Sequence, residues 1–116
     1  MFKKVALSIA SVAVAGSVLF ASQTVTEAAY YPVQKTGSGL DIRTTPTING
    51  TRTQSNIPDG TNLWLYCYVN GESYMGSKVW DYVDDNGYGG SFNYGYAPDY
   101  FIKTGSSKPV VGYCSF

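Results

Sequence analysis

Short runs of alternating apolar and polar residues, each ended by a turn, constrain the fold of this chain more than any other feature. The chain has 116 residues, among them 13 glycines and 11 tyrosines. Turn-forming pairs such as Asn49-Gly50 and Asp59-Gly60 end the runs after a few residues. No window after residue 28 has apolar residues at the i, i+3, i+4 and i+7 positions of a helix face. The sequence therefore predicts an all-β domain of short strands, either a small barrel or a sandwich.

The most regular run spans residues 63–69 and predicts a strand with two unlike faces. Alternate residues of a strand point to opposite sides of its sheet. One side of this strand is aliphatic apart from Cys67, and the other side carries Trp64, Tyr66 and Tyr68. The aliphatic side is expected to face the core. The predicted core consists of Leu40, Ile42, Ile57, Leu63, Leu65, Val79, Val83, Ala97 and Ile102.

A second predicted strand, residues 79–83, follows a polar turn at residues 70–73. Its alternation places Trp80 and Tyr82 on the same side of the sheet. If the two strands pair, about five aromatic rings gather on one surface, and exposed aromatic clusters are typical of binding sites for peptides or sugars. The alternative is that the glycine- and tyrosine-rich segment 88–95 folds back and buries this surface, in which case the aromatic residues are structural.

The N-terminus has the three parts of a secretory signal peptide. Lys3 and Lys4 supply a short positive start, residues 5–20 carry no charge, and small residues surround Ala28. We therefore expect a helical signal peptide, cleavage after Ala28, and a protein that is extracellular or associated with the cell wall. An uncleaved membrane anchor is the alternative, although the apolar run is slightly short for a membrane span.

Composition divides the chain into four expected parts. Residues 1–28 are the signal peptide, 29–38 a lead-in segment, 39–104 the barrel domain and 105–116 a C-terminal tail. No second apolar run follows residue 28, so the mature form is expected not to span a membrane. The mature form carries six basic and seven acidic side chains, a net charge of about −1, and nucleic acid is therefore not an expected partner.

Two cysteines, Cys67 and Cys114, remain in the part of the chain that is expected to be exported. In an oxidising compartment an even pair favours a disulfide, which would tie the tail back to the domain. Closing a loop of this length stabilises a small domain by about 4 kcal/mol in the chain-entropy model. The alternative is a redox-active or metal-binding pair, which needs closer spacing or histidine partners, and the chain has no histidine.

Catalysis finds little support among the residues of the domain. Acid–base and nucleophilic mechanisms at neutral pH usually employ histidine, or a carboxylate or lysine with a shifted pKa. Residues 84–87 have the oxygen-rich composition of a calcium loop, but not the alternating ligands and closing glutamate of an EF-hand. We predict no catalytic residues, no metal site and no cofactor. The four aspartates that could cluster in the fold are Asp81, Asp84, Asp85 and Asp99.

Several short motifs follow one another in a characteristic order between residues 36 and 114. They are Leu40-Asp41-Ile42-Arg43 with Pro46, Ile57-Pro58-Asp59-Gly60-Thr61, Cys67, Val79-Trp80-Asp81, Tyr96-Ala97-Pro98-Asp99-Tyr100-Phe101-Ile102, and Pro109 with Cys114. This order and spacing resembles a secreted bacterial SH3 (SH3b-type) domain of the disulfide-bearing kind. The segment 51–56 is more polar than is usual in that family, and the segment 88–95 is longer.

The resemblance implies a small SH3-like barrel of five to six short strands with a binding function and no enzymatic activity. It implies cell-wall peptide, peptidoglycan or another surface polymer, or a surface protein, as the partner of a monomer. Trp80 and Tyr96 are the strongest candidates for ligand contact, because they match aromatic groove positions of the family. The predicted ligand-binding aromatic face consists of Trp80, Tyr96, Trp64, Tyr82 and Tyr66.

Two other functional classes fit the size and composition of the chain. One is a small secreted antimicrobial or toxin-like protein, although the near-neutral charge argues against simple cationic disruption of membranes. The other is a secreted hydrolase or hydrolase inhibitor. Inhibition of neighbouring bacteria would favour the first class. Turnover that disappears in Asp81→Asn or Asp99→Asn variants would favour a hydrolase.

Overall fold

The structure, a computed structural model, describes residues 28–116, and the segment 1–27 with most of the expected signal peptide lies outside the described residues. The described strands form a single antiparallel sheet in the order β1-β4-β5-β6-β2-β3. The elements are β1 (Ala29–Pro32), β2 (Leu40–Arg43), β3 (Arg52–Ile57), β4 (Asn62–Tyr74), β5 (Ser77–Asp84), the 3-10 helix η1 (Tyr88–Gly90), β6 (Tyr94–Pro98) and the 3-10 helix η2 (Asp99–Phe101).

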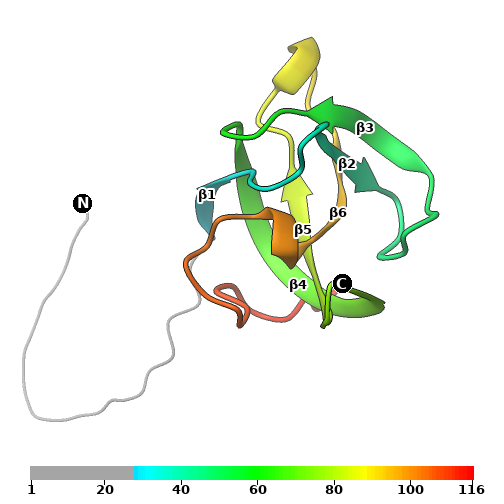
Figure 1. The fold of residues 1–116 in the computed structure, drawn as a ribbon, viewed down its shortest axis with the longest axis vertical. Coiled ribbons are helices and arrows are strands. Elements are labelled where there is room, and N and C mark those ends of the chain that lie inside the picture. The colour runs from blue at the N-terminus through cyan, green and yellow to red at the C-terminus, as the bar shows by residue number, and fades with distance from the viewer. Residues whose placement is uncertain (1–27) are drawn as a thin grey trace, which may run out of the picture.

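The sheet curls into a half-barrel with the core inside the curl (Figure 1). This arrangement confirms the predicted fold class, an all-β, small SH3-like barrel with six strands. Helical structure in the described part is limited to the two short 3-10 helices. Within residues 28–116, no helix has the length and apolarity that a membrane span needs.

Strand β4 is long and bent, and it pairs with both β1 and β5 (Figure 1). Its register shifts at Tyr66, because Leu65 and Cys67 pair with adjacent residues of β5. Such a bulge exchanges the inward and outward positions of the residues that follow it. Leu65 is therefore fully buried, Cys67 faces outward, and Tyr68 packs against the core. The prediction of uniform alternation over residues 63–69 is wrong beyond the bulge.

The predicted turn at residues 70–73 is also wrong. Strand β4 continues to Tyr74, and the chain reverses at Met75 and Gly76, which both have positive φ angles, 50° and 81°. Positive φ at both central positions is the geometry that suits a two-residue hairpin turn. Gly71 serves close packing instead, since a Cβ there would lie 2.4 Å from the carbonyl oxygen of Pro46.

The core contains eight of the nine residues predicted for it, and the exception is Val79, which is only partly buried. Val33 and Val111 also belong to the core, although they come from the segments expected to be a lead-in and a tail. The lead-in thus forms part of the sheet, with β1 paired to β4. This strand has only four residues, too few for a clear alternating pattern in the sequence.

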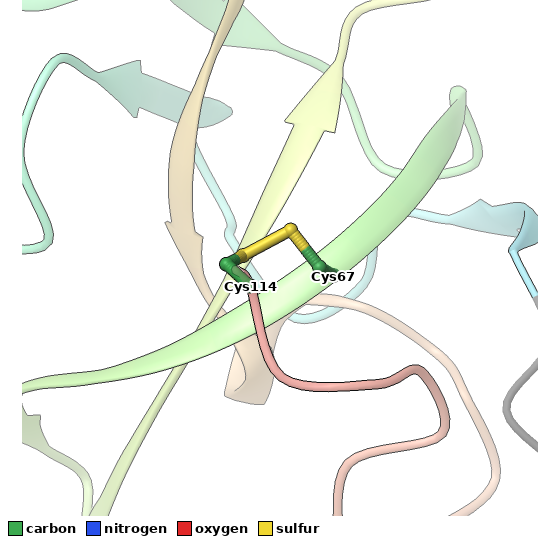
Figure 2. The surroundings of a disulfide bond; sticks show 2 residues. All are labelled: Cys67 and Cys114. Carbon is green, nitrogen blue, oxygen red and sulfur yellow. A yellow bond between two sulfur atoms is a disulfide. The ribbon is translucent and has the colours of Figure 1, made fainter. Parts of the chain in front are cut away.

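The predicted disulfide between Cys67 and Cys114 is confirmed. It links β4 to the C-terminal segment, which passes over that strand (Figure 2). The Cα atoms of the two cysteines are 4.9 Å apart. The backbone reinforces the link, because the amide of Cys114 donates a hydrogen bond to the carbonyl of Tyr68 at 2.8 Å.

Candidate functional site

Seven aromatic side chains form a continuous chain of ring contacts that spans several strands of the sheet. Neighbouring ring centroids lie between 4.7 and 6.4 Å apart, and most of the pairs are edge-to-face. This spacing and orientation are favourable for aromatic pairs. The residues come from β1, β4, β5, β6 and the C-terminus. We call this set the aromatic face: Tyr30, Trp64, Tyr66, Tyr82, Tyr94, Tyr96 and Phe116.

The aromatic face is accessible to a ligand. Tyr30, Tyr66 and Tyr94 expose 54%, 40% and 47% of their surface, and Phe116 exposes 82%. The other members are half-buried. The alternative, in which Tyr88, Phe92 and Tyr94 fold back and bury this surface, holds only in part. Within the described residues, Tyr94 is the ring of that segment that packs on the face, and Tyr66 beside it stays 40% exposed.

A short hydrogen bond fixes Tyr66 at the centre of the aromatic face. Its hydroxyl donates to Oδ2 of Asp84 at 2.6 Å. Oδ1 of the same carboxylate accepts from the amide of Asn86 at 2.9 Å. The hydrogen bond to Asp84, with smaller contributions from burial and from the negative charge of that residue, raises the pKa of Tyr66 well above its usual value. Tyr66 therefore presents a neutral ring whose hydroxyl is held in a fixed direction.

The disulfide builds a groove next to this ring. The groove has a volume of about 470 Å³ and is lined by Tyr66, Tyr82, Tyr113 and Phe116, with Cys67 and Cys114 among its walls. The C-terminal segment forms one side of it, and Figure 2 shows how the disulfide holds that segment over β4. The disulfide thus has a positional role beside its contribution to stability.

The structure brings together four of the five aromatic residues predicted from the sequence: Trp64, Tyr66, Tyr82 and Tyr96. The fifth, Trp80, lies elsewhere and is only 1% exposed. Its indole nitrogen donates to the carbonyl of Glu72 at 2.7 Å, and its ring packs close to Gly71. Trp80 is therefore not available for stacking on a ligand.

Three members of the aromatic face were not among the residues predicted to contact a ligand. Tyr30 lies in the short strand β1, and Tyr94 lies in a segment that was expected to form a loop. Phe116 reaches Tyr82 only because the disulfide brings the C-terminus back, with 5.1 Å between the two rings. Only the position of Phe116, two residues after Cys114, hinted at this contact in the sequence.

Asp85 is a fully buried carboxylate whose two oxygens are both satisfied. Oδ1 accepts from the amides of Gly87 and Asn93, at 3.0 and 3.1 Å. Oδ2 accepts from the side-chain amides of Gln54 and Asn93, at 3.1 and 2.9 Å. Burial acts to raise the pKa of Asp85, but these donors outweigh it and hold the pKa below its usual value. Asp85 therefore closes the 85–93 loop. In residues 28–116, no group of three or more side chains could together hold a metal ion.

Asp81 and Asp99 form a second buried acidic site, which lacks the N–H donors that surround Asp85. Asp81 is fully buried and Asp99 is 6% exposed. Both oxygens of Asp81 and Oδ1 of Asp99 are buried, and no N–H group of the described residues donates to them. The two carboxyls contact each other, and such a contact is favourable only when one of them carries a proton. Burial, assisted by this contact, raises the pKa of Asp81 to about 10, and burial also raises the pKa of Asp99.

Of the four aspartates that could have clustered, the structure pairs only Asp81 with Asp99 among the residues it describes. Asp84 supports the aromatic face and Asp85 closes its loop. The hydrogen bonds made by residues 84–87 explain the oxygen-rich composition of that segment.

Comparison with known proteins gives two similar chains of nearly the same length. No protein-family model matches the sequence. Uncharacterized protein YraI of Bacillus subtilis (strain 168) is 34% identical over 117 residues, which cover 95% of this chain and 95% of that protein. Uncharacterized protein YraJ of the same organism is 30% identical over 119 residues, which cover 99% of this chain and all of that protein.

Proposed function

The chain belongs to the family that includes YraI and YraJ, and from this premise we propose that it is a secreted, non-catalytic binding protein with a bacterial SH3-type barrel. Its target is a cell-wall polymer, either the peptide or the glycan of peptidoglycan. The observation that carries the proposal is the aromatic face, an exposed series of contacting rings on one sheet. The Cys67–Cys114 disulfide supports export, because disulfides persist mainly in oxidising compartments.

The aromatic face suits an extended ligand better than a compact one. Contacts run from Tyr30 through Trp64, Tyr66 and Tyr82 to Phe116, so successive units of a polymer can each rest on a ring. Tyrosine and tryptophan offer large apolar surfaces together with a polar group that can hydrogen-bond a sugar or a peptide. Exposed aromatic surfaces of this extent are typical of binding sites.

The carboxylates of the domain support binding rather than catalysis. Asp84, the carboxylate bonded to the aromatic face, is 5% exposed and already accepts from Tyr66 and Asn86. Asp81 is fully buried, which keeps it from contact with a substrate. A general acid or base has to reach the reacting atoms within hydrogen-bonding distance, directly or through one water.

The proposal is tested by the retention of purified protein on isolated cell-wall sacculi. We expect the wild type to be retained. Trp64→Ala should weaken retention by about three- to tenfold, in line with about 1 kcal/mol for one aromatic contact. Tyr66→Ala should have a similar effect, whereas Tyr66→Phe keeps the ring and should lose less. Phe92→Ala is the matched control, because Phe92 is 60% exposed but lies outside the aromatic face.

Each result of this experiment bears on a different part of the proposal. If sacculi do not retain the wild type, wall binding is wrong. If Trp64→Ala and Tyr66→Ala fold and are retained as well as Phe92→Ala, the aromatic face is not the binding site.

A further inference from the structure

A second cavity of about 790 Å³ lies away from the aromatic face. Its walls come from η2, from the chain that follows it, from residues 34 and 35, and from the turn between β4 and β5. None of the seven residues of the aromatic face lines it. Cavities of roughly 300–1,000 Å³ are typical of small-molecule sites. The lining residues that matter here are Gln34, Lys35, Asp99, Tyr100 and Lys103.

One wall of this cavity contains a buried carboxylate. Asp99 lines the cavity and is more than nine-tenths buried, and no N–H group of the described residues donates to its Oδ1. Asp81 does not line the cavity, and it carries the proton that the two carboxyls share, so the negative charge of the pair rests on Asp99. A buried carboxylate with so few donors favours a ligand that supplies N–H groups. A protonated amine supplies both the donors and the opposite charge.

Two basic side chains also line the cavity. Lys35 and Lys103 are exposed and line it, and neither forms a salt bridge within residues 28–116. The ammonium of Lys35 lies 5.4 Å from the centre of the Tyr100 ring, which favours a position beside η2. The cavity is therefore lined by one carboxylate and two ammonium groups.

Hydrogen bonds hold the walls in place before any ligand binds. The amide of Gln34 donates to the carbonyl of Phe101 at 2.8 Å, and the side-chain amide of Gln34 donates to the carbonyl of Tyr100 at 3.2 Å. The amide of Lys103 donates to the carbonyl of Pro32 at 2.8 Å. A ligand would thus enter a preformed cavity without the entropic cost of ordering these segments.

We propose that this cavity binds a small zwitterion, namely a free amino acid or the end of a short peptide. Its ammonium group lies against Asp99, and its carboxylate faces Lys35 and Lys103. The site is independent of the aromatic face, so either of the two can be absent without affecting the other.

The experiment is a calorimetric titration of the purified protein with trialanine and with matched derivatives. N-acetyl-trialanine lacks the ammonium group, trialanine amide lacks the carboxylate, and free alanine separates an amino-acid site from a peptide site. We expect saturable binding of trialanine or alanine, at least tenfold weaker binding of the acetylated peptide, and a smaller loss for the amide. Asp99→Asn should weaken binding at least tenfold, and Lys103→Ala should weaken it several-fold. Lys108→Ala is the matched control, because Lys108 does not line the cavity.

Three results would overturn the proposal: no saturable binding of either zwitterion, equal binding of the acetylated peptide, or unchanged affinity in a folded Asp99→Asn variant. If that variant does not fold, the acetylated peptide still decides the question on the wild type. The retention assay on sacculi tests Trp64 and Tyr66, and the calorimetric titration tests Asp99 and Lys103. Failure of one proposal therefore leaves the other to be judged by its own experiment.

Discussion

Two buried acidic sites in the same small barrel are built in opposite ways. Asp85 is fully buried and accepts four hydrogen bonds, two on each oxygen. Asp81 is just as buried, but its contact is another carboxyl, that of Asp99. The first site lowers the pKa of its aspartate and the second raises it. Burial alone therefore does not determine the charge state of a carboxyl, because the donors around it decide the direction.

The two acidic sites also differ in the role that their hydrogen bonding suits them for. The donors to Asp85 come largely from its own loop, from Gly87 and Asn93. The carboxylate of Asp85 therefore closes that loop and has no oxygen left without a donor. The carboxyls of Asp81 and Asp99 receive no such N–H donors, and Asp99 lines a cavity. Unsatisfied buried polar groups are uncommon in folded proteins, and they are candidates for ligand contact when a cavity adjoins them.

The largest effect on stability is expected from Asp85→Ala. The substitution leaves four donors around residues 54, 87 and 93 without their acceptor, and we expect it to lower the free energy of unfolding by about 3–5 kcal/mol. Urea denaturation measures this change. Asp85→Asn is the matched variant, because its amide oxygen can satisfy one pair of donors but its NH₂ group faces the other pair. It should therefore lose less than Asp85→Ala. A loss below about 1 kcal/mol in Asp85→Ala would show that water replaces the carboxylate.

The second prediction concerns how stability depends on pH. The folded protein holds a proton on Asp81 up to about pH 10, whereas the unfolded chain releases it near the ordinary value of 3.8. Between these values the folded state binds more protons, so the stability from this group falls as pH rises, by up to about 1.4 kcal/mol per pH unit. Asp81→Asn removes the titrating group and should flatten this fall in urea denaturation at pH 5, 7 and 9. The two basic residues of the cavity lining, Lys35 and Lys103, remain in both proteins.

Asp85 gives the opposite sign at the acidic end. Its folded pKa is lowered, so its contribution is complete above the unfolded value and is lost as pH falls through the folded value. Asp81→Asn should keep this acidic loss, and Asp85→Asn should remove it. A wild-type stability that rises between pH 6 and pH 9, or an equal slope in Asp81→Asn, would contradict the assignment of the buried proton.

The smallest effect is expected at Asp41, a half-buried carboxylate whose partner is an exposed arginine. Asp41 accepts from Arg52 at 3.0 Å, but the side chain of Arg52 is 61% exposed. Exposed ion pairs contribute little, so Arg52→Ala should change the free energy of unfolding by no more than about 0.5 kcal/mol. A change above about 1.5 kcal/mol in the same denaturation assay would mean that this pair is more strongly coupled to the fold than its exposure suggests.

The sequence was sufficient to predict the fold class, the disulfide and most of the core, because alternation and turn residues are local signals. It was not sufficient for β4, where the bulge at Tyr66 turns Cys67 outward and Tyr68 inward. A bulge changes the side of every later residue, and no residue type in that segment marks it. Gly71 was misread for a related reason, since a glycine needed for close packing against Pro46 looks the same in sequence as a turn glycine.

The candidate site was predictable to a similar extent. Trp64, Tyr66, Tyr82 and Tyr96 were found by alternation, and the structure groups them. Trp80 was misplaced because its indole packs against Gly71 and Glu72, two residues of β4 that were expected to form a turn. The pairing of Asp81 with Asp99 depends on η2 folding against β5, which is a tertiary contact.

The contrast between the two buried acidic sites is tested most directly by ¹³C NMR titration of the aspartate carboxyl carbons in the folded protein. We predict that Asp85 titrates below the ordinary value of 3.8 and that Asp81 titrates far above it, near 10. An Asp81 carboxyl that titrates close to 4 in the folded protein would contradict this account.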